Sequence, residues 1–309
     1  MPLDPHAKRL LDMLALARPA DPAQMAIEER RESFRKLMAL SRGGADVASV
    51  EDRTIPGPGG PLTVRFYRPE GEGDGPLPVV IFFHGGGLVA GDLDTHDALC
   101  RILCHGIGAI VAAADYRLAP EHPFPAAIED SIAATAWIAE NAAGLGIDPE
   151  RIVVAGDSGG GTLATIVCQK AREAGPRIAL QLLLCPVLDL GAETASRQEF
   201  ATGYLLDRAL MARDLEHYGP VDPRDPLVSP LRADDLAGMP RTLIHSAAFD
   251  PLRDEDAAYA RRLEEAGVAV SHTCHAGMPH HFYGLTGIVP AARESLDAIC
   301  REARAVLAR

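Results

Sequence analysis

The sequence is short of basic residues and contains no long apolar run, and each absence excludes a class of protein. Its 309 residues include 30 Lys and Arg against 43 Asp and Glu, which gives a formal net charge of -13. This balance argues against binding to nucleic acid, because a phosphate backbone selects basic surfaces. No run approaches the ~18 apolar residues that a membrane-spanning helix needs. We therefore expect no nucleic-acid partner and no membrane span.

Paired cysteines are also missing. The six cysteines show none of the C-x-x-C spacings that are typical of zinc sites. Cys100 and Cys104 are four residues apart on a predicted helix, where core packing explains them better than a metal does. We expect reduced core cysteines, no metal and no cofactor, in a cytoplasmic protein.

The amino terminus offers one alternative to a cytoplasmic location. Lys8 and Arg9 precede the apolar residues 10–17, a pattern similar to a secretory signal. Asp12 interrupts that run, and the run is short for a signal core. An amphipathic helix is the better interpretation.

A glycine-flanked serine is the strongest signal in the chain. Residues 152–155 have the length and β-branched character of a buried strand, and residues 162–173 are rich in helix formers. Ser158 lies on the turn between them. Gly156 and Gly160 flank it where a side chain would clash as the backbone doubles back. This G-x-S-x-G pattern predicts a nucleophile elbow that exposes the Ser158 hydroxyl, although a Gly/Ser loop that caps a helix has the same local pattern.

A histidine and three glycines follow an earlier strand, predicted at residues 79–83. Such a loop can point several backbone N–H groups in one direction, where they can stabilise an oxyanion, but alone it could equally be a tight turn. Placed ahead of an elbow, it supplies the second half of an oxyanion hole. We predict Gly86, Gly87 and Gly159 as the donors. The expected supporting residues are His84, Gly85, Gly156, Asp157 and Gly160.

Apolar runs that alternate with helical segments predict an α/β fold with a mainly parallel sheet covered on both faces. Residues 1–48 precede the sheet and are predicted to form two helices, the second at 27–40. Residues 53–55 and 62–67 predict an antiparallel pair at one edge. Between 188 and 228 the pattern breaks, which indicates an insertion. The other predicted strands are 79–83, 109–114, 152–155, 178–184, 242–246 and 268–273.

A nucleophilic serine needs a base, and the base needs an acid. Among the acidic residues after Ser158, Asp250 follows the strand at 242–246, so it lies at the carboxyl end of a strand, where α/β sheets place their sites. The neighbouring acids 254–256 lie in the first turn of a helix, and the helix dipole explains them.

Six histidines follow the serine. His245 is predicted to be a core residue, His272 to lie in the last strand, and His275 just beyond its end. His280 and His281 follow the turn at 277–279, in the loop after that strand. Both are candidates for the base.

These motifs together resemble the hormone-sensitive-lipase family of α/β-hydrolases, particularly its bacterial esterases. The resemblance covers nearly the whole chain. It implies a central sheet of about eight strands, a core formed by 49–187 and 229–309, a helical cap formed by 1–48 and 188–228, and hydrolysis of carboxylic esters. The matching segments are 84–87, 115–121 with Pro123 and Pro125, 156–160, 229–231, 250–255 and 277–282.

The resemblance also assigns residues. Asp250 matches the family acid, and Phe282 aligns His280 with the base, so that His281 takes the place of the usual glycine. Gly159 stands where the family often has alanine. The peptide bonds Ala119-Pro120 and Phe124-Pro125 are expected to be cis.

The two cap segments are expected to roof the pocket over the serine, which predicts a small-molecule ester with a short to medium acyl chain. The predicted pocket residues are Phe34, Leu88, Tyr204, Leu205, Leu206 and His281. A non-catalytic ligand-binding protein on the same fold, or a lactonase or amidase that uses the same triad, is the alternative. The resemblance alone allows a homodimer.

Overall fold

A computed structural model describes residues 2–16, 21–41, 44–71, 75–220 and 222–308. In this part of the chain an eight-stranded sheet has the order β1-β2-β4-β3-β5-β6-β7-β8. The pairs β1–β2 and β2–β4 are antiparallel and all the others are parallel, which confirms the predicted fold class. The strands are β1 (Ser49–Gly57), β2 (Gly60–Arg68), β3 (Leu77–Phe83), β4 (Ile110–Ala114), β5 (Ile147–Asp157), β6 (Leu180–Leu184), β7 (Thr242–Phe249) and β8 (Val270–Pro279).

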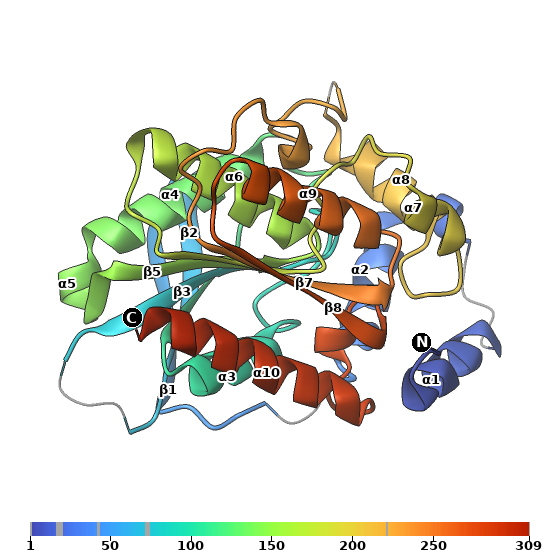
Figure 1. Ribbon diagram of the computed structural model, residues 1–309, viewed down its shortest axis with the longest axis horizontal. Coiled ribbons are helices and arrows are strands. Elements are labelled where there is room, and N and C mark those ends of the chain that lie inside the picture. Colours follow the sequence, from blue (N-terminus) through green and yellow to red (C-terminus); the bar gives the residue numbers. More distant parts are fainter. Residues whose placement is uncertain (1, 17–20, 42–43, 72–74, 221, 309) are drawn as a thin grey trace.

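The inner strands are apolar on both faces because helices cover both faces (Figure 1). Successive side chains of β3 alternate between two cores: Val80 and Phe82 pack toward α3 and α10, and Val79 and Ile81 pack toward α4, α6 and α9. Burial on both sides explains why this strand reads as one continuous apolar run. The helices are α3 (Asp97–Ile107), α4 (Ala126–Glu140), α5 (Ala142–Leu145), α6 (Gly159–Ala174), α9 (Arg253–Glu265) and α10 (Pro290–Leu307).

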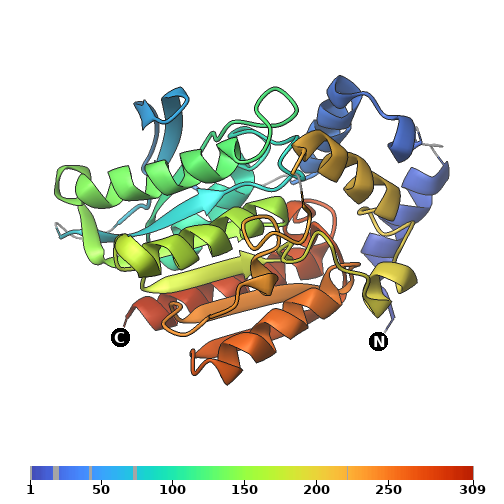
Figure 2. The same ribbon diagram turned by 90° about the horizontal axis from the view of Figure 1, so that it is seen from above.

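Two segments far apart in the sequence meet beside the carboxyl ends of the parallel strands. Figure 2 shows the amino-terminal helices next to α8 at one end of the sheet. The first segment holds α1 (Pro5–Leu16), the short helix η1 (Pro22–Gln24) and α2 (Ile27–Met38), and the second holds α7 (Ala195–Glu199) and α8 (Arg208–Tyr218). Two further short helices are η2 (Pro230–Arg232) and η3 (Phe282–Gly284). Among the described residues, no helix is both long and apolar enough to cross a membrane.

The last strand corrects the sequence prediction. β8 runs to Pro279 rather than ending near residue 273, so His275 lies inside the strand, and residues 277–279 extend it after a shift in register instead of forming a turn. β8 is the last strand of the sheet, with a partner strand on one side only, and most of its residues are partly exposed. Its sequence is therefore polar and lacks the apolar run by which the other strands were predicted. For the same reason Cys274 is exposed, whereas the other five cysteines are buried as predicted.

Two further predictions have clear outcomes. The peptide bonds Ala119-Pro120 and Phe124-Pro125 are both cis, as expected. The predicted helix at 27–40 is confirmed and ends at Met38. The sequence also predicts that the first helix ends before Pro19 and that Gly43 and Gly44 follow the end of the second. Ala17, Pro19 and Gly43 lie outside the described residues.

Candidate active site

Ser158 lies on a sharp turn between β5 and α6. Its backbone has φ 49° and ψ -120°, a strained conformation for a residue with a side chain. A Cβ atom on Gly156 would overlap the carbonyl of Gly160, and one on Gly160 would overlap the carbonyl of Phe83. The neighbouring backbone therefore leaves no space for a side chain at either flanking position.

The serine is the first member of a hydrogen-bonded chain that joins three strand ends. Nε2 of His280 is 3.1 Å from Ser158 Oγ, and Nδ1 of the same ring is 2.7 Å from Asp250 Oδ2. Because a carboxylate only accepts, Nδ1–H donates to Asp250 and Nε2 is left to accept the serine proton. The Leu252 N–H donates to Oδ1 of Asp250 at 2.9 Å and holds the carboxylate in place. The relative exposure of these three residues is 4% or less.

The adjacent His281 does not join this chain. Its Nδ1 lies 2.9 Å from the hydroxyl of Tyr283. Its backbone has φ 61°, a left-handed conformation that explains why glycine suits this position. Burial, together with His280 and Arg30, holds the pKa of His281 well below its ordinary value, so its ring stays neutral.

The loop after β3 is braced against the serine turn. The Gly85 N–H donates to Asp157 Oδ1 at 2.8 Å. The His84 ring stacks between His96 and Tyr116, and burial and then His96 lower its pKa to about 4. His84 is therefore a neutral ring packed beside this loop, and its supporting role stays a prediction.

This loop touches the residue after the serine. A Cβ atom on Gly159 would lie 3.4 Å from the backbone nitrogen of Gly87, so the two backbones are in contact. Gly86 and Gly87 have φ 121° and 67°, which side chains rarely adopt. Gly159 is also the first residue of α6, whose amino terminus favours negative charge. The contact places Gly87 next to Gly159, the residue that follows the serine.

Three cavities adjoin this centre. The smallest, about 40 Å³, contains Ser158, Gly87 and Leu206 in its wall. A larger and mainly apolar cavity of about 280 Å³ is lined by residues that include Phe34 and Leu205. His281 and Arg30 line both.

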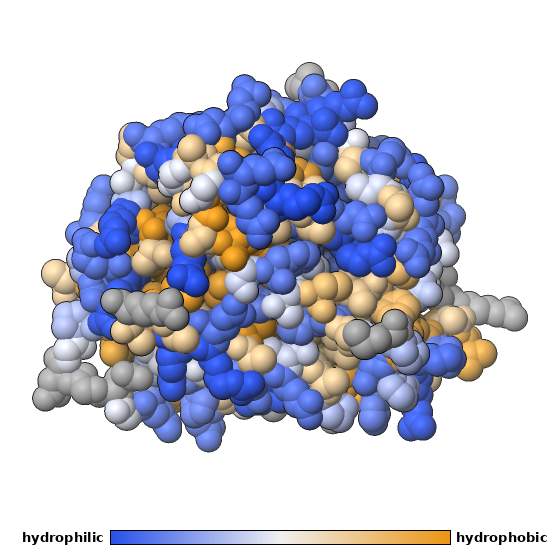
Figure 3. All heavy atoms as spheres, in the orientation of Figure 1, coloured by the Kyte–Doolittle hydropathy of each residue, from blue (hydrophilic) through white to orange (hydrophobic). Residues whose placement is uncertain are grey.

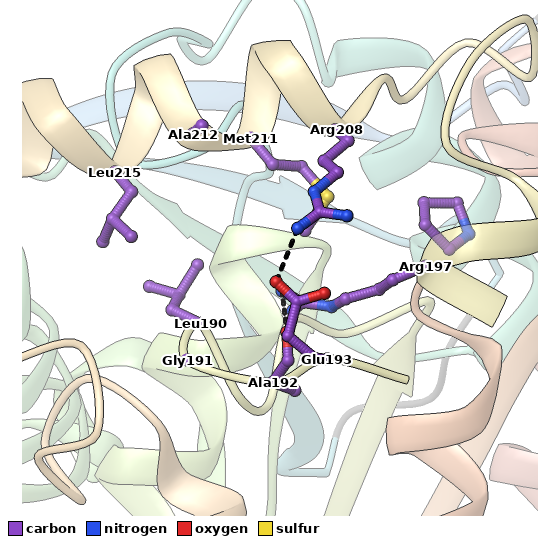
Figure 4. A pocket seen from close by; sticks show the side chains of 10 residues that line it. Leu190, Gly191, Ala192, Glu193, Arg197, Arg208, Met211, Ala212 and Leu215 are labelled. Atoms are coloured by element: carbon purple, nitrogen blue, oxygen red, sulfur yellow. Dashed lines mark hydrogen bonds and ion pairs between the residues drawn. The ribbon is translucent and has the colours of Figure 1, made fainter. Parts of the chain in front are cut away.

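A third cavity of about 250 Å³ shares Leu190, Met211 and Leu215 with the serine cavity. Figure 4 shows Arg208 of α8 reaching across it to Glu193, with a side-chain separation of 2.7 Å.

Two of the predicted pocket residues lie elsewhere. The Tyr204 ring stacks on Phe249 and meets Phe200 edge to face, so it packs in an aromatic cluster and lines none of these three cavities. Leu88 is buried in the core, where its backbone adjoins Gly159. Sequence spacing placed both close to the site but could not say which way the side chains point.

The sequence analysis missed a buried ion pair in the roof of the site. Nη2 of Arg30 on α2 lies 2.9 Å from Oδ2 of Asp214 on α8, and Nε lies 3.1 Å from Oδ1. Burial raises the pKa of Asp214, and the guanidinium opposes that rise. The available signal was a charged residue one turn before Phe34, on the apolar face of a predicted helix.

One cluster of metal-ligand type surrounds the same centre. Single ligand atoms of Cys185, Asp250 and His280 lie within 4.8 Å of one another. The separation of 2.7 Å between Asp250 and His280 is that of a direct hydrogen bond and leaves no room for a cation between them. Burial and then Asp250 raise the pKa of the Cys185 thiol, which keeps it protonated. The cluster therefore fits a proton relay better than a metal centre.

Known proteins share this architecture. A family model described as alpha/beta hydrolase fold matches residues 80–284. The chain is 44% identical to carboxylic ester hydrolase LipN of Mycobacterium tuberculosis, across 90% of this chain and 76% of LipN. It is 40% identical to carboxylesterase NlhH of the same organism, across 95% and 92% of the two chains.

Solved structures agree. An esterase of the archaeon Pyrobaculum calidifontis superposes with a TM-score of 0.92 at 40% identity and covers 99% of both chains. An ester hydrolase from the metagenome of Lake Arreo, solved with a derivative of bipyridine phosphonate, has a TM-score of 0.95 at 38% identity, with 99% of this chain and 100% of that chain covered.

Proposed function

Because this chain belongs to the α/β-hydrolase family and is a serine carboxylic ester hydrolase, we propose that Ser158, His280 and Asp250 perform the hydrolysis. The observation that carries this assignment is the continuous hydrogen-bonded chain from Asp250 through His280 to Ser158, next to a cavity that the serine lines. A buried ring held by a carboxylate has a defined tautomer, which is what a general base requires.

In the acylation step, Ser158 Oγ attacks the carbonyl carbon of the ester while its proton moves to Nε2 of His280. The carbonyl oxygen becomes an oxyanion, which the N–H groups of Gly86, Gly87 and Gly159 stabilise. Asp250 stabilises the imidazolium. When the tetrahedral intermediate collapses, His280 returns the proton to the departing alcohol and an acyl-enzyme remains.

Deacylation repeats these steps with water. Water gives a proton to His280 and attacks the acyl carbon, and Ser158 then leaves with that proton. The small cavity at the serine, about 40 Å³, favours a short acyl group or a short alcohol at the reacting carbon. We therefore infer a preference for short- to medium-chain esters. A lactone or an activated amide could undergo the same steps, so both belong in the test.

We also infer that residues 1–48 and 188–228 form one cap over a core of 49–187 and 229–309. The support is the contact between the two segments at the buried pair Arg30–Asp214, beside the serine cavity. A cytoplasmic location and a homodimer stay predictions, to be checked by cell fractionation and by sedimentation equilibrium.

The test combines covalent labelling with turnover. An organophosphate should add one adduct per chain on the peptide that contains Ser158, and Ser158→Ala should remove the adduct. Aryl esters of graded acyl length, with one amide and one lactone, should show the highest kcat/KM at short to medium length. Labelling that persists in Ser158→Ala would refute the assignment, and equal rates across all acyl lengths would refute the size preference.

A further inference from the structure

The charge pair in the roof lies where two distant segments meet above the serine. The Arg30 and Asp214 side chains are 8% and 7% exposed, although the two residues are 184 positions apart in the chain. A Cβ atom on Gly87 would overlap the Asp214 carboxylate, so the pair rests directly on the predicted oxyanion loop. Both residues line the cavity that contains Ser158.

Arg30 also faces the larger cavity. Together with His281 it lines both the serine cavity and the apolar cavity of about 280 Å³, so these two residues lie where the two cavities approach each other. A substrate half that extended from the serine cavity toward the apolar cavity would meet Arg30. The rest of that cavity is mostly apolar, with Leu11, Leu14, Met25, Leu37, Leu205 and Leu210 in its lining.

The guanidinium of Arg30 is only partly used. Nε and Nη2 donate to Asp214, and the group lies over the Phe34 ring at 5.3 Å. No hydrogen bond joins Nη1 to any residue that the structure describes. Nη1 keeps some accessible surface, although the residue as a whole is only 7% exposed, so this donor can be reached from the cavity. Arg30 thus offers donor capacity beside a cavity whose lining is mostly apolar.

We propose that Arg30 determines substrate specificity by donating a hydrogen bond from Nη1 to an uncharged oxygen of the ester substrate. That oxygen belongs to the substrate half that enters the apolar cavity, as a ketone, ether, hydroxyl or second ester group. The acceptor is uncharged because Asp214 already balances the guanidinium, which leaves no net charge to attract an anion. The inference rests on the proposed function and names the substrate class of the same site.

Two matched ester pairs test this preference and show which half of the substrate faces Arg30. One pair is an aryl levulinate against the aryl pentanoate, which differ by one ketone in the acyl half. The other pair is pentyl acetate against its analogue with a ketone at the penultimate carbon of the alcohol. The wild-type kcat/KM should favour the ketone by about 3- to 10-fold in one pair, the usual net worth of one hydrogen bond. A ratio near one in both pairs would overturn the proposal.

Substitutions at Arg30 and Asp214 distinguish recognition of the substrate by Arg30 from its structural role in the roof. Arg30→Met with Asp214→Leu replaces the pair by apolar side chains of similar size, a change that buried ion pairs often tolerate. The ketone preference should then fall to about one. Arg30→Lys keeps the charge but loses the planar guanidinium, so it should weaken the ketone preference. This variant replaces the double variant in the test if the double variant does not fold. Persistence of the full preference in either folded variant would overturn the proposal.

Arg31→Met is the matched control. Arg31 is the next residue of α2, pairs with Glu121 and lines neither cavity. Its substitution should leave the kcat/KM ratio of ketone ester to alkyl ester unchanged. If this ratio falls to one in Arg31→Met, the preference depends on the position of α2 and not on Arg30.

A binding measurement keeps the inference separate from the chemistry. Calorimetry on Ser158→Ala should show the ketone preference as a ratio of Kd values, and adding the double substitution should reduce that ratio to about one. Equal Kd values for ketone and alkyl ester in Ser158→Ala alone would overturn the inference. Failure of Ser158→Ala to abolish turnover would instead overturn the proposed nucleophile.

Discussion

The two sides of the reaction chamber are built in different ways. On the sheet side, Ser158, Asp250 and His280 follow β5, β7 and β8, and hydrogen bonds of 2.7 and 3.1 Å join them. On the roof side, two segments far apart in the chain meet at a buried ion pair, and η1 lies against α8. The sheet side is thus fixed by strand ends and direct hydrogen bonds, whereas the roof limits the space above Ser158.

The outer edge of the roof is also less covered. On α1, Met13 and Leu16 are 62% and 82% exposed, and Figure 3 shows hydrophobic residues at the surface over this helix. Sheet-side residues of comparable hydrophobicity, such as Phe82 and Val153, are fully buried. We therefore expect changes on the sheet side to abolish chemistry, and changes in the roof to alter substrate range and rate.

The largest effect is expected from the adjacent histidines. His280→Ala should lower kcat by about 10⁴-fold or more, because the serine loses its base. His281→Gly should keep most of the activity, because glycine suits the φ of 61° and His281 contacts Tyr283 rather than the serine. Steady-state kinetics on one aryl ester compare the two. If the second variant is inactive and the first is active, the base is His281.

Removal of the amino-terminal half of the roof should have the next largest effect. Deletion of residues 1–45 should lower kcat/KM by about 100-fold and flatten the acyl-length profile, because water then reaches the oxyanion site and the substrate loses a wall. Far-UV circular dichroism should still report the sheet, while exposed apolar surface lowers solubility. A truncated protein that keeps both rate and length profile would show that these helices are not part of the site.

Substitutions where the insertion at 188–228 attaches to the core should lower the free energy of unfolding. Glu255 accepts from the Leu188 N–H at 2.8 Å and pairs with Arg197 at 2.8 Å. Glu255→Ala should cost about 3 kcal/mol of unfolding free energy, because Arg197 stays buried without its partner. Glu193→Ala breaks the exposed pair with Arg208 and should cost under about 1 kcal/mol. Equal urea-unfolding losses would contradict this difference.

The smallest effect is expected at the residue after the serine. Gly159→Ala restores the residue that is common in the family, and its Cβ would lie 3.3 Å from the Leu88 nitrogen, which is tight but not an overlap. Turnover should change by only a few fold, and lower backbone entropy of the unfolded chain should stabilise by about 0.4–1 kcal/mol. Gly160→Ala, whose Cβ would overlap the Phe83 carbonyl, should instead fail to fold stably. Similar melting temperatures for the two variants would refute this distinction.

Much of the sheet side could be predicted because its signals are local. Short apolar runs indicated the strands, and the strained turn at Ser158 required glycines two residues before and after it. Asp250 followed from its position after a strand, since parallel strands place their carboxyl ends together. The length of β8 could not be predicted in this way, because an edge strand with polar residues lacks an apolar signature.

By itself, the sequence indicated the fold class, Ser158 and Asp250, because strand periodicity and glycine conformation act over a few neighbouring residues. The residues alone left His280 and His281 as candidates for the base, and the family resemblance favoured His280. Only the tertiary structure decided that His280 rather than His281 meets the serine, that Tyr204 packs away from the cavities, and that Arg30 pairs with Asp214. Cavity walls and buried charge pairs arise where segments far apart in the chain pack against each other. No local pattern encodes which side chains will face one another there, because that depends on the packing of the whole chain.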